Sequence, residues 1–211
     1  MPGIVHVVDD DASYLSAIQQ VLEASGYRVA TYASAQQLLE QRPDESKGCI
    51  LLDVRMPGMS GLELQSRLTE RGSTLPIIFL SAYPDVSITV KAIKAGADDF
   101  LIKPVGPDDL LKAIARAIAR HRNARELDGE LEALRARLST LTPRQRQVFE
   151  IIVQGKTSKH AARELGSTER TIKAHRSAIM DKLQVQSVVE LVRIAERLGV
   201  LGEKDEPGTA V

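Results

Sequence analysis

Short apolar runs alternate with amphipathic stretches of helical period through roughly the first 120 residues of this chain, a pattern typical of βα units around a parallel sheet. The five strands expected are Ile4 to Val8, Arg28 to Tyr32, Cys49 to Asp53, Pro76 to Ser81 and Asp99 to Ile102. The helices expected between them are Ala12 to Ser25, Ala35 to Arg42, Leu62 to Arg71 and Ser87 to Ala95. A fifth helix begins near Pro107. We therefore predict an α/β doubly wound (βα)5 domain over residues 1–120.

The helical pattern continues through residues 121–140, which we expect to form a linker helix. Five leucines there are spaced 4, 3, 4 and 3 residues apart, as at the a and d positions of a coiled coil. They are Leu127, Leu131, Leu134, Leu138 and Leu141. So short a seam is compatible with a coiled-coil dimer, with a helix laid on one domain and with a solvated linker. The sequence leaves the three open.

Residues 141–201 are helical in pattern and are expected to form a second, all-α domain of four helices. Thr142-Pro143 has the form of an N-cap followed by proline at the first helical position. The helices expected are Pro143 to Gln154, Ser158 to Leu165, Glu169 to Lys182 and Ser187 to Arg197. A short turn at Gly166-Ser167 joins the second to the third, which indicates a helix-turn-helix. The polar tail, residues 202–211, is expected to be disordered.

Composition limits the partners and the environment of the chain. Residues 1–120 hold 12 basic and 15 acidic residues, a balance of −3, whereas residues 141–201 hold 11 and 6, a balance of +5. The basic balance of the second domain suits a polyanion. The single cysteine, Cys49, excludes a disulfide framework. Because no apolar stretch reaches the ~20 residues that span a bilayer, we expect a cytoplasmic protein without a membrane partner.

Polar residues end four of the five predicted strands. Asp9 and Asp10 follow the first, Asp53 ends the third, Ser81 ends the fourth and Lys103 follows the fifth. In an open α/β sheet, ligands bind outside the carboxyl ends of the strands at the switch in strand order, which for the order 2-1-3-4-5 lies between strands one and three. We therefore expect these five residues to converge on one site.

Three adjacent carboxylates repel one another unless a cation neutralises them. Mg²⁺ is the cation expected here, because it prefers one or two carboxylates, retained waters and phosphate oxygens. That preference leaves one carboxylate of the three available as a nucleophile, and Asp53 is the candidate. Lys103 and the Ser81 hydroxyl can then stabilise incoming phosphoryl oxygens, since phosphoryl transfer depends mostly on positioning and charge neutralisation.

Several motifs in this domain resemble those of the receiver domains of bacterial response regulators. They are Val7-Val8-Asp9-Asp10-Asp11, the run LDVRMPGMSG from Leu52 to Gly61, Ser81-Ala82 and Lys103-Pro104. The resemblance covers residues 4–120 and implies that Asp53 is the phosphoacceptor. It also implies that Asp10 binds Mg²⁺ directly, that Asp9 assists through water and that the Arg55 carbonyl completes the protein ligands.

The same resemblance implies a conformational response to phosphorylation. Ser81 and Phe100 are similar to the switch pair of the family, in which the hydroxyl moves toward the phosphoryl group and the aromatic side chain turns inward. Lys103 is similar to its phosphoryl-binding lysine. The Lys103-Pro104 bond corresponds to a position where the family has a cis peptide, a form that X-Pro bonds tolerate.

The second domain resembles the LuxR-type DNA-binding domains, and with a receiver before it the chain is similar to the FixJ-like regulators. The motifs are Leu141-Thr142-Pro143-Arg144-Gln145, Glu169 to His175 (ERTIKAH) and Ile179-Met180-Asp181-Lys182-Leu183. The resemblance implies base contacts from Lys173, Ala174 and Ser177 and phosphate contacts from Thr171 and Arg176. It assigns dimerisation to the last helix. Departures from the family pattern are Lys159-His160-Ala161 and Gln184, where glycine or asparagine is common.

Together the two resemblances imply a DNA-binding transcriptional response regulator, phosphorylated by a partner sensor histidine kinase. Its further partners would be double-stranded promoter DNA and, when phosphorylated, a second copy of the chain; RNA polymerase is a candidate. A regulator that acts on protein or RNA through its helical module is the alternative. We do not expect an enzyme, because a Mg²⁺-dependent phosphatase of the haloacid-dehalogenase type needs a second aspartate two residues after the first, where this chain has Arg55.

Overall fold

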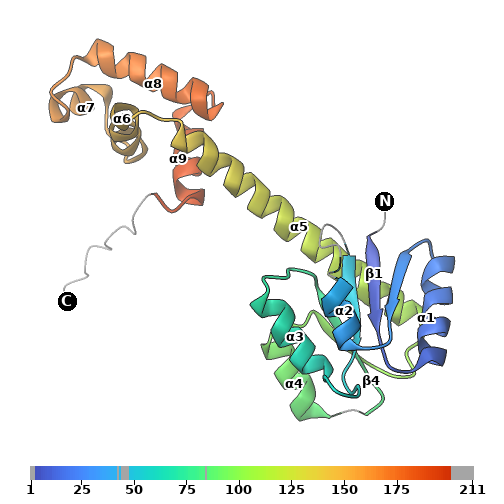
Figure 1. Cartoon of the computed structure of the whole chain (residues 1–211). Coiled ribbons are helices and arrows are strands. Elements are labelled where there is room, and N and C mark those ends of the chain that lie inside the picture. Colours follow the sequence, from blue (N-terminus) through green and yellow to red (C-terminus); the bar gives the residue numbers. More distant parts are fainter. Residues whose placement is uncertain (1–2, 42, 44–47, 84, 201–211) are drawn as a thin grey trace, which may run out of the picture. The chain divides into compact units, whose positions relative to one another are not determined.

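The computed structural model describes residues 3–41, 43, 48–83 and 85–200 (Figure 1). The chain divides into two compact units, Met1–Arg125 and Glu126–Val211, called here the first and the second unit. The tail predicted to be disordered, residues 202–211, lies outside the described residues. No helix in the described part of the chain has the length and apolar character needed to cross a membrane.

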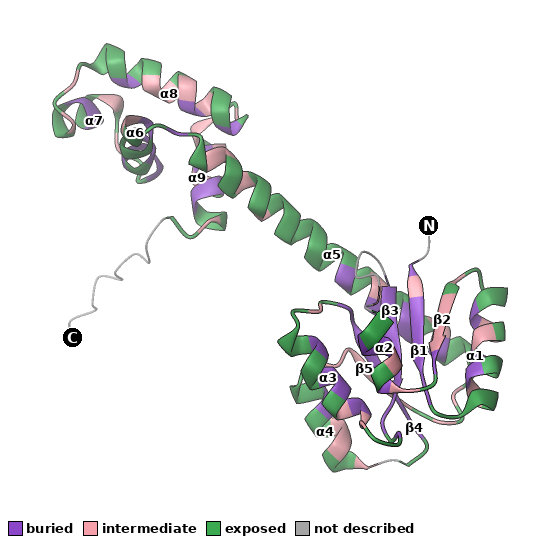
Figure 2. Cartoon of the chain, in the orientation of Figure 1, coloured by how far each residue is buried: buried purple, intermediate pink, exposed green. Residues whose placement is uncertain are grey.

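The first unit is built on a parallel sheet with the strand order β2-β1-β3-β4-β5, as the sequence predicted. The strands are β1 (Ile4–Val8), β2 (Arg28–Tyr32), β3 (Gly48–Asp53), β4 (Ile77–Ser81) and β5 (Asp99–Ile102). In Figure 2 the central strands are purple along most of their length, because β3 and β4 are buried at every residue and β1 at all but its first. Burial on both faces explains why these strands are continuous apolar runs.

Helices cover both faces of the sheet, which confirms the doubly wound fold. The helices before the long one are α1 (Ala12–Ala24), α2 (Ala35–Gln41), α3 (Gly61–Glu70) and α4 (Val86–Lys94). Leucines and isoleucines of α1 share one apolar cluster with the first part of the long helix α5 (Pro107–Ser139) and with one face of β1, β3 and β4. The second cluster, on the opposite face, takes residues from α2, α3 and α4.

The expected fifth helix and the expected linker helix are one continuous helix, α5 (Pro107–Ser139). Within the second unit, Leu134 and Leu138 pack against the apolar core of that unit, whereas the Leu127 side chain is 56% exposed. The end of the seam is thus packed on the second unit, while the first of its leucines is exposed. Burial of the last leucines supplies the reason, since a helix is stabilised mainly by packing its apolar face.

The second unit continues with helices α6 (Pro143–Val153), α7 (Ser158–Glu164), α8 (Glu169–Leu183) and α9 (Val188–Arg197). Each begins after a serine or threonine whose hydroxyl accepts a backbone N–H of the first turn. Thr142 caps α6, with Pro143 at the first helical position, as predicted. The cap of α8 is Thr168. Hydroxyl caps supply partners for N–H groups that a helix leaves unpaired at its start, so the sequence fixes these helix starts closely.

Helix α8 ends in an unusual backbone conformation. Gln184, its C-cap, is left-handed, with φ 56° and ψ 47°, and it is the one non-glycine residue with positive φ in the described chain. A side chain in this region costs about 1–2 kcal/mol because Cβ approaches the carbonyl oxygen. The departure from the glycine or asparagine of the family pattern therefore has a structural cost.

We expect Gln184→Gly to stabilise α8 by about 0.5–1 kcal/mol, because glycine removes this strain while losing more backbone entropy on folding. Hydrogen exchange of the α8 amides in the full chain, measured where exchange reports the opening equilibrium, gives the change in free energy. Gln184→Ala is the matched control, since it shortens the side chain and keeps Cβ. A gain as large for alanine as for glycine would show that the strain is not the cause.

Candidate functional site

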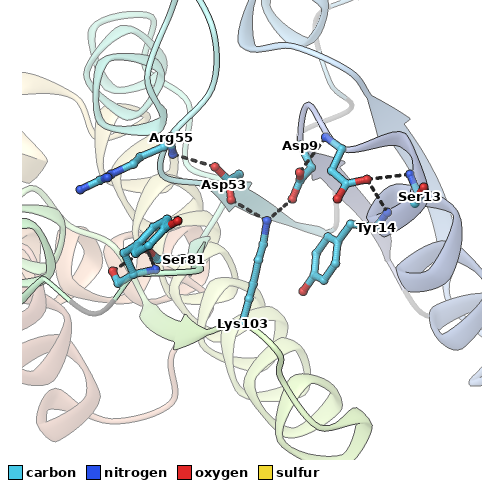
Figure 3. A network of polar contacts seen from close by, with 9 residues as sticks. Asp9, Ser13, Tyr14, Asp53, Arg55, Ser81 and Lys103 are labelled. Carbon is cyan, nitrogen blue, oxygen red and sulfur yellow. Dashed lines mark hydrogen bonds and ion pairs between the residues drawn. The ribbon is translucent and has the colours of Figure 1, made fainter.

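The carboxyl ends of the strands in the first unit bring four predicted site residues together (Figure 3). Asp9 directly follows β1, Asp53 ends β3, Ser81 ends β4 and Lys103 directly follows β5. Asp9, Asp53 and Ser81 are 1%, 7% and 4% exposed, so the site is set into the protein rather than on its surface. The peptide bond between Lys103 and Pro104 is cis, as expected.

One ammonium group joins two carboxylates at the centre of this site. Lys103 Nζ lies 2.5 Å from Asp9 Oδ2 and 2.5 Å from Asp53 Oδ1. Burial raises the pKa of Asp9 above 3.8, and the hydrogen bond from Lys103 offsets that effect only in part. Burial alone would lower the pKa of Lys103, but its hydrogen bonds to Asp53 and Asp9 outweigh burial and raise it. Lys103 is therefore a cation at neutral pH, and two carboxylates share its single charge.

Backbone N–H groups fix the remaining carboxylate oxygens. The N–H of Asp11 donates to Asp9 Oδ1 at 3.0 Å, and the N–H of Arg55 donates to Asp53 Oδ2 at 2.7 Å. Each carboxylate thus holds the lysine with one oxygen and a backbone amide with the other. This arrangement leaves little freedom for either side chain to rotate.

A glycine makes room for the chain beside Asp53. Gly61 is the first residue of α3, and a Cβ placed on it would lie 2.2 Å from the Asp53 carbonyl oxygen, closer than real contacts allow. Its N–H donates to the Val54 carbonyl at 3.0 Å. Gly61 thus lets α3 begin against the end of β3. No role for Gly61 was predicted from the sequence, although this glycine closes the run that follows Asp53.

The structure does not bring the third expected carboxylate into the buried cluster. Asp10 is exposed, and the described residues contain no group of three or more histidine, cysteine, aspartate or glutamate side chains arranged to hold a metal ion. Asp9 is buried beside Lys103 and Asp10 is exposed, so only the first of these two adjacent carboxylates is enclosed in the site. The atoms near Lys103 that could bind a metal ion are nevertheless all oxygens. The two carboxylates, Asp9 and Asp53, carry more negative charge than the single Lys103 ammonium neutralises. This chemistry fits Mg²⁺, which prefers oxygen ligands and keeps several waters.

The Ser81 hydroxyl is hydrogen-bonded to the backbone of the loop that follows β4. It donates to the Tyr83 carbonyl at 2.8 Å and accepts the Tyr83 N–H at 3.2 Å. Phe100 on β5 is half-buried, and the centroid of its ring lies 6.1 Å from that of Phe79. The expected switch pair thus lies on neighbouring strands, with Ser81 bonded to backbone in this state.

Two aromatic contacts at the site were not anticipated from the sequence. Lys103 Nζ lies over the ring of Tyr14, 4.2 Å from the ring centroid. The Arg55 guanidinium lies over the ring of Tyr83 at 5.2 Å. Nothing in the sequence marks Tyr14, because its partner stands 89 positions later and the two meet only through the fold.

In the second unit, α8 presents most of the expected DNA-contacting residues to solvent. Thr171, Lys173, Ala174 and Ser177 are exposed and Arg176 is half-buried. The opposite face is core, since Ile172, Ile179 and Leu183 are buried. Because its N-terminal turn carries exposed polar side chains, α8 has the form of a recognition helix for the major groove.

Side-chain hydrogen bonds join α8, α7 and α6 within the second unit. Lys182 Nζ, near the end of α8, donates to the Thr140 carbonyl and to Gln145 Oε1, at 2.8 Å each. Arg144 on α6 donates to the carbonyl of Leu165, the C-cap of α7. On the exposed face, Lys173 Nζ lies 3.0 Å from Glu169 Oε1.

Family models match both units. Residues 5–115 match the response regulator receiver domain, and residues 139–195 match the bacterial regulatory proteins of the luxR family. The response regulator protein TmoT of Ectopseudomonas mendocina is 42% identical over 93% of this chain and 89% of its own length. The transcriptional regulatory protein FixJ of Bradyrhizobium diazoefficiens is 38% identical over 95% of this chain and 98% of its own length.

Solved structures agree with this relationship. The response regulator StyR is 43% identical, with a TM-score of 0.82 over 93% of this chain and all of the StyR chain. Full-length FixJ from B. japonicum is 39% identical, with a TM-score of 0.59, and the match covers 94% of this chain and 98% of the FixJ chain. The chain therefore belongs to the two-component response regulators of the FixJ-like type, transcriptional regulators that join a receiver domain to a LuxR-type helix-turn-helix domain.

Proposed function

We propose that Asp53 accepts a phosphoryl group from a partner sensor histidine kinase and that this event controls the binding of α8 to double-stranded promoter DNA. The observation that carries the proposal is the setting of Asp53, whose two oxygens are held by Lys103 and by the Arg55 N–H. A carboxylate oriented on a fixed ammonium is placed for in-line attack on phosphorus.

In the transfer, an oxygen of Asp53 forms a bond to phosphorus while the bond from phosphorus to the donor breaks, and the leaving atom keeps the electron pair. Lys103 neutralises charge on the phosphoryl oxygens, which is the main catalytic requirement of such a reaction. Mg²⁺, when bound, supplies further neutralisation. Asp9, Asp10, Asp53 and the Arg55 carbonyl would hold it, with Asp9 acting through water.

Ser81 and Phe100 would carry the change away from Asp53. The Ser81 hydroxyl leaves the backbone of Tyr83 and donates to a phosphoryl oxygen, and Phe100 then turns inward on β5. Inverting a 1:99 population needs about 5.5 kcal/mol of preference for one state. Several charge-assisted hydrogen bonds to a phosphoryl group can together supply it. The surface formed by α4 and β5 would change as a result.

On DNA, Lys173, Ala174 and Ser177 would contact bases, and Thr171 and Arg176 would contact phosphates. Phosphorylation would favour a homodimer through the last helix, so that two copies of α8 reach half-sites about one helical turn, roughly 34–36 Å, apart. RNA polymerase would be a further partner, and the cytoplasm the location. The exposed polar face of α8 and membership of a DNA-binding family favour DNA over RNA or protein.

The chain would act as a regulator and not as an enzyme. A phosphatase of the haloacid-dehalogenase type would use a second aspartate two residues after Asp53, and Arg55 stands there with its side chain exposed. Its guanidinium lies over the Tyr83 ring. Repeated hydrolysis of an added phosphomonoester, at many turnovers per chain, would support the enzyme instead.

Asp53→Asn is expected to abolish phosphorylation, because an amide oxygen is too weak a nucleophile to displace the donor. Intact-mass analysis after incubation with acetyl phosphate and Mg²⁺ would show one added phosphoryl group on the natural chain and none on the variant. Asp85→Asn is the matched control, since asparagine can also cap α4. A phosphoryl group still gained by the first unit of Asp53→Asn would mean that another residue is the acceptor.

Lys173→Ala is expected to weaken binding to the preferred duplex by about 1–3 kcal/mol and to relax sequence preference, as for a lost base contact. Arg176→Ala should weaken binding to all sequences and lower the salt slope by about 1, as for a lost phosphate contact. Titrations of cognate and random duplexes at several salt concentrations separate the two effects. Lys112→Ala removes the same charge from the first unit and serves as the control. Equal losses on both duplexes for both variants would rule out this division of roles.

A further inference from the structure

The Lys103 ammonium has a third partner besides the two carboxylates. It lies 2.5 Å from an oxygen of Asp9 and 2.5 Å from an oxygen of Asp53, and it stands over the Tyr14 ring at 4.2 Å from the centroid. Figure 3 shows the ring beside the ammonium, on the side of α1. The face of an aromatic ring attracts a cation, most strongly where water is excluded, and the Lys103 side chain is only 15% exposed.

The first turn of α1 holds the ring in this place. Asp11 caps the helix, and its Oδ1 accepts the N–H of Ser13 at 2.9 Å and the N–H of Tyr14 at 3.2 Å. The N–H of Asp11 in turn donates to Asp9 at 3.0 Å. The carboxylate on one side of the ammonium and the ring on another are therefore positioned by the same short segment.

The hydroxyl of Tyr14 has no part in this contact. Tyr14 Oη is buried and has no hydrogen-bond partner within the described part of the chain, and in Figure 3 it points away from the carboxylates. Burial raises the pKa of this phenol, so it remains neutral. A buried hydroxyl without a hydrogen-bond partner is unfavourable. The favourable contact of the Tyr14 side chain with Lys103 is therefore made by the ring and not by the hydroxyl.

We propose that the Tyr14 ring is a positioning element for Lys103 in phosphoryl transfer to Asp53. The inference rests on the proposed function. As an Asp53 oxygen bonds to phosphorus, that carboxylate loses its charge and releases the ammonium, and the leaving atom of the donor takes the electron pair. The ring holds Lys103 before and after this step, so the ammonium stays where the phosphoryl oxygens arrive. Groups fixed in advance avoid reorganisation during the reaction.

The first test compares variants of the full chain in rate of phosphorylation by acetyl phosphate with Mg²⁺. We expect Tyr14→Leu to be phosphorylated about three- to tenfold more slowly than Tyr14→Phe, the range that a partly desolvated cation–π contact supplies. Tyr27→Leu is the matched control, because Tyr27 packs against the same apolar cluster as Tyr14, whereas the ring that Lys103 contacts is that of Tyr14. Equal rates for Tyr14→Leu and Tyr14→Phe would overturn the proposal.

A second series removes any ambiguity from altered folding. Phenylalanine carrying one, two or three fluorine atoms, introduced at position 14, weakens the negative face of the ring in steps and changes its shape little. We expect the logarithm of the phosphorylation rate to fall steadily along the series. A purely structural role for the ring would leave the rate flat, and that result would also overturn the proposal.

A third measurement needs no phosphodonor and therefore separates this inference from the proposed function. In NMR spectra of the full chain, the ring current should shift the Lys103 Cε protons upfield in the natural protein and in Tyr14→Phe. The same protons should not be shifted in Tyr14→Leu. Unchanged shifts in Tyr14→Leu would disprove the contact itself. If the shifts behave as expected but Asp53 takes no phosphoryl group, the proposed function fails while the ring contact stands.

Discussion

The sharing of one ammonium by two buried carboxylates is the constraint on which the receiver domain depends. Lys103 lies between Asp9 and Asp53, and the three come from the ends of β1, β3 and β5. Only a sheet in which β1 and β3 are neighbours and all strands run parallel brings these ends together. The apolar runs on both faces of the sheet, and Gly61 beside Asp53, maintain this geometry.

Within this arrangement the Asp9 carboxylate opposes stability, as groups prepared for chemistry often do, whereas the raised pKa of Lys103 shows that the fold favours its charged form. Burial raises the pKa of Asp9, so the folded domain binds a proton at this carboxyl more readily than the unfolded chain does. The resulting contribution to stability is fully present below the ordinary value of 3.8 and is lost as the pH rises through the raised pKa. At neutral pH the ionised group therefore costs stability, and a bound cation would recover part of it.

Much of the fold could be predicted because its signals are local. Three of the five strands have the predicted ends and the others differ by one residue. For β1 and β3, glycine and aspartate mark the two ends of the apolar run. The strand-end cluster was predictable for the same reason. The packing of the end of α5 on the second unit could not be predicted. The leucines would be spaced in the same way in a coiled-coil dimer, in a helix packed on one domain and in a solvated linker. Tyr14 and the bond from Ser81 to Tyr83 depend on tertiary contacts or loop geometry that no sequence period records.

The stability of Asp9→Asn in metal-free buffer tests the account most directly. Lys103 remains paired with Asp53 in this variant, so no buried charge loses its counter-ion, while one desolvated carboxylate is removed. We expect the free energy of unfolding of the receiver domain, from hydrogen exchange of the buried β1 and β3 amides, to rise by about 1–2 kcal/mol. Added Mg²⁺ should stabilise the natural chain more than the variant. A fall in the free energy of unfolding would contradict the account, because it would mean that Asp9 and Lys103 stabilise the fold as an ordinary ion pair.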